Sequence, residues 1–430
     1  MAEFITLYLP PLASDSYRQA IDFQKILVRG KFHYYFSPSR GKLYKLSKSE
    51  EIKLKLTGQI AESKDATPEF LKKITSKTMI ISTSKKMHIF PTTLCNSSCI
   101  YCYASPGKCR YKLSLKTAQK AIDFIANKSE PLEINFHGGG EPLLEKGLIA
   151  KIIKYAKKKC CKVRVLVQSN GVMDKKTRAW VLKNVDYLVI SCDGPPEIQD
   201  VQRPLKGKRK SSGYVESTIK FFANKKIGFH VMATITPLSV LKMDKILEYF
   251  HSLGVKCVGM NPVFGHNGYD VDLNLFGKKF IEAKKLADTL GVLLFSPQMF
   301  PIHRGRTQGC GFSDIMFCLT PDGFVSNCYE TVSSKIGPKE FLYGRFDGNG
   351  FKFDQKKVSW MRKRRVENLP YCQQCLLRWT CAGGCASHSL KETGDLFAQP
   401  KDKCRVKQEI FKDYLIHLAK NFFNKTQKRK

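Results

Sequence analysis

The stretch Cys95-Asn96-Ser97-Ser98-Cys99-Ile100-Tyr101-Cys102 carries three cysteines directly after an apolar run at 87–94. Three thiolates at this spacing fit a [4Fe–4S] cluster in which one iron keeps an open position. A structural zinc site needs four closed ligands, so Cys109 or His88 would have to complete it. The spacing therefore favours an iron–sulfur cluster with an open iron, with zinc as the alternative.

From residue 86 to about residue 300, apolar runs typical of buried strands alternate with helical patterns. A regular alternation of this kind predicts parallel strands joined by right-handed helical crossovers. A closed eight-stranded barrel needs about 250 residues, so six units over 86–300 predict an α/β fold with a partial, open (β/α)6 barrel. The expected strands are 87–94, 132–137, 163–168, 187–191, 228–235 and 255–262, and the expected helices are 113–128, 143–159, 174–185, 212–226 and 238–253.

Polar loops follow the first four expected strands. The cysteine stretch follows the first, and the others are 137–142 (HGGGEP), 168–171 (QSNG) and 191–195 (SCDGP). The carboxyl ends of parallel strands meet at one edge of a sheet, where the active sites of barrels and open α/β folds are built. We therefore expect these loops to form one site.

A second group of cysteines lies in 301–404, and the segment 372–385 alone has a spacing that a zinc knuckle would also show. Eight cysteines supply two complete sets of four, which favours two closed clusters. The remaining five cysteines, 109, 160, 161, 192 and 257, are expected to be small buried hydrophobes. The eight are Cys310, Cys318, Cys328, Cys372, Cys375, Cys381, Cys385 and Cys404.

The chain of 430 residues has 73 basic and 37 acidic residues, a formal net charge of +36. Such an excess indicates either a solvated basic surface or an acidic partner, peptide or nucleic acid. No run of about 18 apolar residues occurs, which argues against a transmembrane helix. The N-terminus lacks the features of a signal peptide, so a cytoplasmic location is expected.

The pattern predicts four segments along the chain. Residues 1–85 form a small N-terminal module with a hairpin around 37–41 and a helix starting near Ser47. Residues 86–300 form the partial barrel, and residues 301–404 form a cysteine-rich domain. Residues 405–430 form an amphipathic helix with a basic tail, and the helix is expected to dock on the core through an apolar stripe.

The residues at the strand ends carry a family resemblance. The cysteine stretch, with Tyr101 before its last cysteine, resembles the cluster loop of radical S-adenosylmethionine (SAM) enzymes, and Gly139-Gly140-Glu141-Pro142 resembles their second motif. The resemblance implies that Cys95, Cys99 and Cys102 hold a [4Fe–4S] cluster whose open iron is chelated by SAM. The SAM contacts it implies are Tyr101, Gly139, Gly140, Glu141, Asn170, Ser191 and Arg203.

The cysteine order after 301 resembles the SPASM extension of that family. This resemblance implies two auxiliary [4Fe–4S] clusters with interleaved ligands. The proximal cluster would take Cys310, Cys318, Cys328 and Cys385. The distal cluster would take Cys372, Cys375, Cys381 and Cys404. With the SAM-binding cluster, the chain would hold three [4Fe–4S] clusters.

SPASM enzymes mostly modify ribosomally made peptides and proteins, so the resemblance implies a peptide maturase that cleaves SAM reductively and removes a hydrogen atom from its substrate. Cross-linking, epimerisation and oxidation are the expected outcomes, with flavodoxin or ferredoxin as electron donor and no membrane partner. Sulfatase-maturing members carry an aspartate directly after the third cysteine of the extension, where this chain has Tyr329 and then Glu330. Both residues are candidate catalytic groups. Sulfatase maturation and RNA modification remain alternatives, and the N-terminal module is a candidate dock for a leader peptide.

Overall fold

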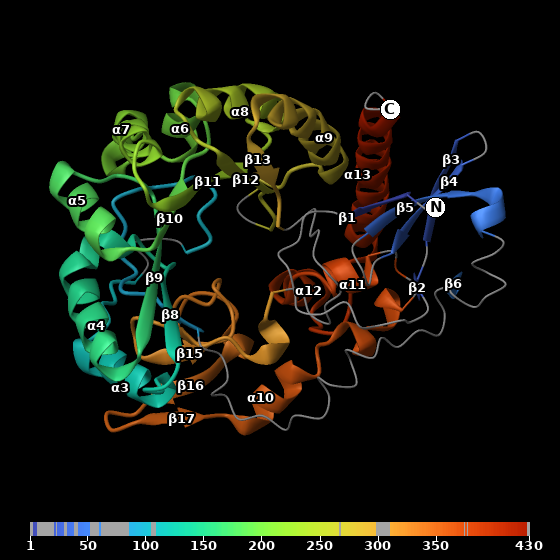
Figure 1. The fold of residues 1–430 in the computed structure, drawn as a ribbon. Helices are drawn as coiled ribbons and strands as arrows, with labels where there is room; N and C mark the ends of the chain where they lie inside the picture. The colour runs from blue at the N-terminus through green and yellow to red at the C-terminus, as the bar shows by residue number, and fades with distance from the viewer. Residues whose placement is uncertain are drawn as a thin grey trace. The chain divides into compact units, whose positions relative to one another are not determined.

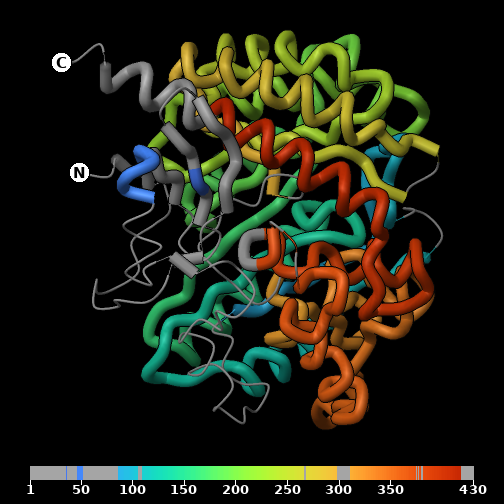
Figure 2. Tube along the Cα trace, turned by 90° about the vertical axis from the view of Figure 1, so that its right-hand side faces the viewer, coloured from blue at the N-terminus to red at the C-terminus, as the bar shows by residue number. Residues whose placement is uncertain are grey.

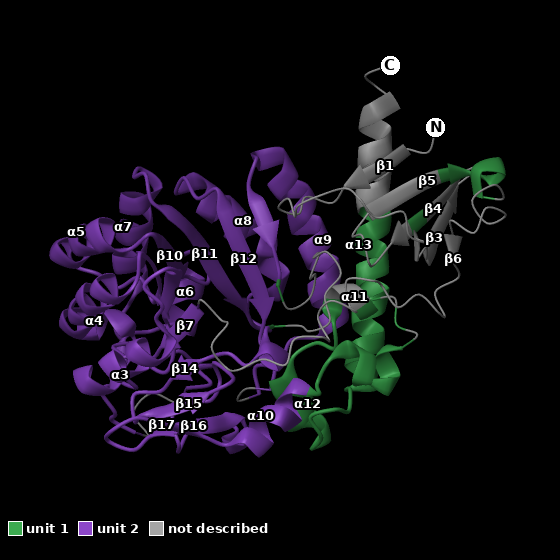
Figure 3. Ribbon diagram, turned by 60° about the horizontal axis from the view of Figure 1, so that its bottom comes forward, with its two compact units in different colours: residues 1–78, 297–310, 363–430 green, residues 79–296, 311–362 purple. Residues whose placement is uncertain are grey.

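The structure is a computed structural model that falls into two compact units (Figure 3). The larger unit holds residues 79–296 and 311–362, and the smaller holds 1–78, 297–310 and 363–430. The residues it describes are 3–6, 21–22, 24–29, 32–37, 42–51, 60–61, 86–104, 109–265, 268–297, 310–373, 375 and 377–427.

The larger unit is built on a parallel sheet in the strand order β13-β12-β11-β10-β9-β8-β7. Each neighbouring pair in this series is parallel, which confirms the predicted α/β class. Six of the strands match the six predicted runs, and β13 is an additional seventh. The bounds are β7 (Lys86–Ile89), β8 (Pro131–Phe136), β9 (Lys162–Ser169), β10 (Tyr187–Ser191), β11 (Gly228–Ile235), β12 (Cys257–Pro262) and β13 (Leu293–Phe295).

Helices α3 to α9 lie on the outer side of this curved sheet (Figure 1). Figure 2 shows α8 and α9 next to each other in this layer, and the two helices are in contact. Their apolar faces are buried, and each fully buried phenylalanine, such as Phe222 or Phe250, contributes about 1.5–3 kcal/mol. The bounds are α3 (Leu115–Ile125), α4 (Lys146–Lys159), α5 (Lys175–Asn184), α6 (Pro196–Gln202), α7 (Ser212–Ala223), α8 (Met243–Ser252) and α9 (Leu273–Leu290).

The first strand is shorter than predicted. β7 ends at Ile89, whereas the apolar run continues to residue 94. Pro91 has no N–H to give to a sheet, and its carbonyl accepts a hydrogen bond from Leu113 N. Thr93 N donates to Tyr111 O in the same way. Residues 91–94 therefore pair with 111–113 and turn away from the parallel sheet.

The sheet continues beyond β7 with residues from the cysteine-rich region. β14 (Cys318–Leu319) is parallel to β7, and β15 (Phe324–Ser326), β16 (Leu342–Phe346) and β17 (Phe351–Phe353) follow it in antiparallel order. Helix α10 (Gln355–Arg362) completes this part. Residues 311–362 therefore share one sheet with the predicted barrel. The predicted boundary at 300 lies before this shared part.

The smaller unit contains a four-stranded antiparallel sheet of order β1-β5-β4-β3. The predicted hairpin is confirmed, because β4 and β5 pair across 37–42. Ser47 Oγ accepts a hydrogen bond from Glu50 N at 3.2 Å, and Glu50 Oε2 accepts one from Ser47 N at 2.8 Å, a capping box that starts the predicted helix. The strands are β1 (Glu3–Thr6), β2 (Ile21–Asp22), β3 (Gln24–Arg29), β4 (Phe32–Ser37), β5 (Lys42–Ser47) and β6 (Ile60–Ala61).

The C-terminal part of this unit ends in the predicted long helix, α13 (Lys401–Gln427), which contacts β3. Four residues of its apolar stripe are buried as expected, namely Ile410, Phe411, Tyr414 and Leu415. The side chains of the stripe beyond 417 lie outside the described part. Two shorter helices precede α13, α11 (Arg378–Cys381) and α12 (Ala386–Thr393). Short 3₁₀ turns are η2 (Pro142–Glu145), η3 (Lys206–Lys208), η4 (Val240–Lys242), η5 (Phe312–Asp314), η6 (Lys339–Phe341), η7 (Val366–Asn368) and η8 (Pro370–Cys372).

Among the described residues, no helix has the length and apolar character needed to cross a bilayer.

Candidate active site

The loops after β7, β8, β9 and β10 meet at one end of the parallel sheet. Glu141 N donates to Leu94 O at 2.8 Å, which joins the loop after β8 to the loop after β7. Asn170 Nδ2 donates to Asn96 Oδ1 at 2.6 Å and to Ser97 Oγ at 3.0 Å, which joins the loop after β9. The structure thus brings the predicted polar loops together around the cysteine stretch.

The three cysteines of that stretch are half-buried. Burial is the main cause that raises the pKa of Cys95 to about 11 and that of Cys99 to about 12. Arg203 opposes the shift at Cys99, where its Nη1 lies 3.8 Å from the sulfur. A thiolate at such a site needs a positive partner, which bound iron would supply. Three thiols on one loop, coupled to one another, fit the cluster that the sequence predicts.

The glycine-rich loop approaches the cysteine stretch too closely for any other residue. A Cβ atom on Gly140 would lie 2.0 Å from Leu94 O. Gly138 and Gly139 both have positive φ, +65° and +59°, a conformation that favours glycine. The absence of side chains at 138–140 therefore lets this backbone pack closely against residues 90–94, directly before the cysteines. This cradle fits the predicted contact with SAM.

Glu141 has protein partners of its own in this structure. Its carboxylate accepts hydrogen bonds from Asn170 N at 2.7 Å, Ser169 Oγ at 2.9 Å and Leu143 N at 3.1 Å. Burial raises the pKa of Glu141, and these hydrogen bonds oppose the rise. Glu141 therefore ties the ends of β8 and β9 together. Its predicted contact with the SAM amino group would be made from this fixed position.

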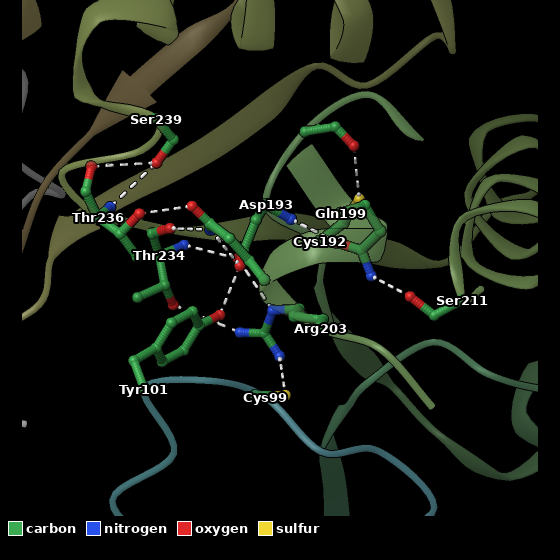
Figure 4. A network of polar contacts seen from close by, with 12 residues as sticks. Cys99, Tyr101, Cys192, Asp193, Gln199, Arg203, Ser211, Thr234, Thr236 and Ser239 are labelled. Atoms are coloured by element: carbon green, nitrogen blue, oxygen red, sulfur yellow. Dashed lines mark hydrogen bonds and ion pairs between the residues drawn. The ribbon is translucent and has the colours of Figure 1, made fainter. Parts of the chain in front are cut away.

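A second buried network centres on Asp193, after β10 (Figure 4). Its carboxylate accepts hydrogen bonds from Arg203 Nε at 2.9 Å, Tyr101 Oη at 2.5 Å, Gln202 Nε2 at 2.7 Å and Thr234 N at 2.9 Å. Burial alone would lower the pKa of Arg203, but Asp193 and its neighbours raise it well above its usual value. Asp193 therefore anchors the predicted SAM contacts Tyr101 and Arg203 to the sheet.

Tyr101 and Arg203, the two predicted SAM contacts that Asp193 holds, also contact each other. The Tyr101 ring lies under the Arg203 guanidinium, with 5.4 Å from the guanidinium carbon to the ring centroid. Tyr101 and Arg203 thus form one buried unit beside Cys99. Ser191 is buried at the end of β10, on the same edge of the sheet.

Sequence reasoning missed the residues that hold this network. Asp193 belongs to the quoted loop 191–195 but was not singled out, and Gln202 and Thr234 carried no signal at all. Gln202 Oε1 accepts a hydrogen bond from Thr236 Oγ1 at 2.6 Å, which extends the network to the end of β11. The one signal in the sequence that points to this network is Asp193 itself, an aspartate in the loop after a strand.

Tyr329 lies in a half-buried aromatic group with two histidines of the barrel. Its Oη is 2.9 Å from His88 Nδ1, and its ring centroid is 4.5 Å from that of His137. Burial is the main cause that lowers the pKa of His88 to about 3 and that of His137 to about 4. Both imidazoles are therefore neutral at neutral pH, and an unprotonated Nδ1 of His88 can accept a hydrogen bond from the Tyr329 hydroxyl.

This aromatic group borders the cysteines. Tyr329 packs on an apolar cluster that includes Phe90 and Cys318 and that also contacts Cys102. Glu330, the other candidate catalytic residue, is half-buried. Burial, Cys102 and Glu330 together raise the pKa of Tyr103, which places Glu330 near the cysteine stretch. Both candidates therefore lie close to the predicted SAM cluster.

The four cysteines predicted for the distal auxiliary cluster all lie in the smaller unit. Burial and the neighbouring thiols of Cys375, Cys381 and Cys404 raise the pKa of Cys372 to about 12. Burial, Cys381 and Glu392 raise the pKa of Cys404 to about 11. Mutual coupling of these thiols fits a shared cluster.

The proximal set is divided between the units. Cys318 and Cys328 belong to the larger unit, and Cys310 and Cys385 to the smaller. In register, Cys318 lies opposite His88 of β7. The assignment of these four to one cluster remains a prediction.

Among the described residues, no three histidine, cysteine or acidic side chains are placed to bind one metal ion. Of the five cysteines left over, Cys160 and Cys192 are buried as expected, Cys109 and Cys257 are half-buried, and Cys161 is exposed, contrary to expectation.

The chain is similar to several known proteins. The profile described as the radical SAM superfamily matches residues 89–268. An uncharacterized protein of Methanocaldococcus jannaschii is 32% identical over 173 residues, 40% of this chain and 59% of that protein. A cysteine-type anaerobic sulfatase-maturating enzyme of Clostridium perfringens is 24% identical over 366 residues, 76% of this chain and 96% of the enzyme.

Solved structures share the fold. Native anSMEcpe with bound AdoMet matches 78% of this chain and 99% of its own, with a TM-score of 0.63 and 18% identity. SuiB of Streptococcus suis, bound to its precursor peptide SuiA, matches 90% of this chain and 98% of its own, with a TM-score of 0.56 and 12% identity. The predicted fold class, with its cysteine-rich extension, is confirmed.

Proposed function

Because residues 89–268 form a radical SAM domain and the chain is an enzyme, we propose that it is a maturase that removes a hydrogen atom from a residue of a ribosomally made peptide or protein. When bound, the cluster and SAM supply the 5′-deoxyadenosyl radical for this step. The observation that carries the proposal is the junction of the cysteine stretch with the loops after β8, β9 and β10. It joins the predicted cluster ligands to the predicted SAM contacts.

The chain's own residues hold this junction rigid and dry. Glu141 and Asp193 are buried carboxylates, each with at least three hydrogen-bond donors, and they fix the loops at the strand ends. Reactive radicals need water and side reactions to be kept away. The Tyr101–Arg203 unit and the aromatic group of Tyr329 would help to exclude water from the site.

Comparisons support a peptide or protein substrate. Relatives that align with most of this chain are named sulfatase-maturating enzymes, and a structural neighbour is bound to a precursor peptide. The antiparallel sheet at 3–47 has β3 and β1 at its edges, and a free strand edge can pair with an extended leader peptide. The excess of basic residues would favour an acidic leader.

The position after Cys328 favours a cross-linking or epimerising maturase over sulfatase maturation. A carboxylate can take up a proton from an oxidised intermediate, whereas Tyr329 offers a phenol that is hydrogen-bonded to neutral His88. Sulfatase-type maturation is the second candidate, because named relatives have that activity.

The experiment that tests the proposal follows the hydrogen atom. Fully deuterated peptides encoded by neighbouring genes are incubated with reconstituted enzyme, SAM and dithionite. We expect deuterium in the 5′-deoxyadenosine and a modified peptide. A synthetic peptide with the sulfatase cysteine motif serves as the matched comparison. Faster turnover of that peptide would favour the second candidate, and deuterium transfer from neither kind of peptide would contradict the proposal.

A further inference from the structure

We infer that the exposed basic turn at 206–210 is the docking site of the electron donor, and that the donor is an acidic one-electron carrier protein. This inference rests on the proposed function, because such an enzyme must receive one electron at the cluster of Cys95, Cys99 and Cys102. The carrier would give up one electron and the cluster would gain it, with no other bond changed.

The turn is joined to the cysteine stretch through the backbone. Ser98 N donates to Pro204 O at 2.7 Å, and Ile100 N donates to Gln202 O at 3.1 Å. Lys206 N donates to Asn96 O at 2.9 Å. Residues 96–100 and 202–206 therefore form a short ladder that includes a bridge between Ser97 and Leu205. A protein that binds the turn is held beside the cluster ligands.

The turn itself is fixed in shape. Leu205 is buried, and its N–H donates to Arg209 O at 2.8 Å, which closes the turn. Gly207 and Lys208 have positive φ, 72° and 57°, as in a tight two-residue turn. On the far side, Asp200 accepts hydrogen bonds from Ser211 N and Ser212 N, both at 2.8 Å. Both ends of the turn are thus anchored in the barrel.

Four cationic side chains project from this fixed frame. Lys206, Lys208, Arg209 and Lys210 are all exposed. Arg209 Nε donates to Lys206 O at 3.3 Å, and within the described part of the chain none of the four forms an ion pair. Nearby, Asp200 is engaged with Ser211 and Ser212, and Glu197 on α6 is the exposed carboxylate closest in sequence. The turn therefore presents a positive surface that complements an acidic protein.

Residues beside the turn are neighbours of the cysteines. Ser98 is exposed and stands next to Cys99. Arg203, at the base of the turn, has its Nη1 3.8 Å from Cys99 Sγ. Electron transfer slows steeply with distance, and a carrier bound at this turn would lie near the predicted cluster ligand Cys99.

The general basic charge of the chain is the competing explanation, and α4 provides the matched control. Lys151, Lys154 and Lys158 on this outer helix are exposed as well. The turn variant is Lys206→Glu, Lys208→Glu and Lys210→Glu, which leaves Arg209 in place. The control is Lys151→Glu, Lys154→Glu and Lys158→Glu, so both proteins lose the same charge.

The probe is flavodoxin, an acidic flavoprotein. Binding of oxidised flavodoxin to each protein is measured by calorimetry, and SAM cleavage is measured with photoreduced flavodoxin and with dithionite. In the turn variant we expect flavodoxin to bind about tenfold more weakly and its KM to rise about tenfold. Dithionite, a small reductant, should support the same rate in all three proteins. Raising the salt from about 50 mM to about 300 mM should weaken binding to the unaltered protein and to the control.

Equal flavodoxin binding by the turn variant and the unaltered protein would overturn the inference, as would an equal loss in the α4 control. The binding measurement needs no turnover. If dithionite fails to drive SAM cleavage in any preparation, the proposed function fails, and that result is distinct from a failure of docking.

Discussion

Asp193 shows how one buried carboxylate organises the site. It is fully buried and accepts four hydrogen bonds, from the cysteine loop, from both Gln202 and Arg203, and from the backbone of β11. Removing one partner of a buried ion pair leaves the other charge unpaired, which costs about 3–5 kcal/mol. Asp193 therefore positions Arg203 and Tyr101, and through them Cys99.

Asp193→Asn should lower the unfolding temperature and also reduce SAM cleavage driven by dithionite, because Arg203 loses its anionic partner. Tyr101→Phe removes one hydrogen bond of the same carboxylate and should cost only about 1–3 kcal/mol. Thermal unfolding and 5′-deoxyadenosine formation are measured for both. If the two variants are equally stable, Asp193 does not have the central role assigned to it.

Gly140→Ala should displace the cysteine loop without unfolding the barrel, because the new methyl group would collide with Leu94 O. We expect loss of most SAM cleavage and a weaker SAM-binding isotherm. Gly147→Ala is the matched control, since nothing lies within 4 Å of its added Cβ. Unchanged SAM binding in Gly140→Ala would show that the close approach of these loops does not shape the SAM site.

Tyr329→Phe should separate SAM cleavage from product formation. Proton transfer by a positioned group typically contributes about 10²–10⁴-fold. We expect normal 5′-deoxyadenosine formation with dithionite, but at least tenfold less modified peptide. Glu330→Gln tests the other candidate in the same assay. A Tyr329→Phe enzyme with full peptide turnover would leave Tyr329 as a packing residue only.

At the scale of elements, three histidines lie on strands of the barrel or directly after one, and burial disfavours their protonated forms. Burial lowers the pKa of His230 on β11 to about 4, and those of His88 and His137 to about 3 and 4. An unfolded histidine has a pKa near 6.5. Between pH 6.5 and 4 the unfolded chain therefore binds protons that the folded protein does not. Stability is unaffected above this window and falls as the pH falls through it.

The free energy of unfolding should thus fall between pH 7 and pH 5, by up to about 1.4 kcal/mol per pH unit for each such histidine, and the unfolding temperature should fall with it. His230 lies away from the predicted ligands and is 3.0 Å from Tyr187 Oη. His230→Gln should reduce the pH dependence by roughly one third, because one of three such groups is removed. Thermal unfolding across this range measures it. An unaltered slope in His230→Gln would contradict the burial of a neutral imidazole at this position.

Strand periodicity was sufficient for most elements of the barrel. β10 and β11 have the predicted bounds, because their apolar runs are limited by polar residues at both ends. The end of β7 was wrong, because the pairing of 91–94 with 111–113 depends on contacts distant in sequence. The helix α9 was not predicted, although its 18 residues have a clear apolar face. Its cap at Asp272, which accepts from Leu275 N, was a usable signal.

The sequence pattern predicted the cysteines and glycines of the candidate site but not the residues that hydrogen-bond to them and hold them in place. Regular spacing marks ligands that share one loop, as in 95–102. By contrast, the bonds from Tyr101 to Asp193 and from Tyr329 to His88 join residues far apart in the chain. Only the folded sheet brings such pairs together, so no local sequence pattern predicts these hydrogen bonds.

At the scale of the whole molecule, the chain consists of two units, and each contains predicted cluster ligands. The larger unit contains Cys95, Cys99 and Cys102 together with Cys318 and Cys328, and the smaller contains the other six. The cysteine loop projects from a barrel that is held by its sheet and helices, so the barrel should remain folded without this cluster. Loss of the loop's cysteines should therefore remove one cluster only.

The most direct test measures iron and 5′-deoxyadenosine in the same anaerobically reconstituted preparations, with and without Cys95→Ala, Cys99→Ala and Cys102→Ala together. We predict about twelve iron atoms per chain and dithionite-driven SAM cleavage in the unaltered protein. The triple variant should keep about eight iron atoms and form no 5′-deoxyadenosine. Undiminished SAM cleavage by the triple variant, or none by the fully loaded unaltered protein, would contradict the account.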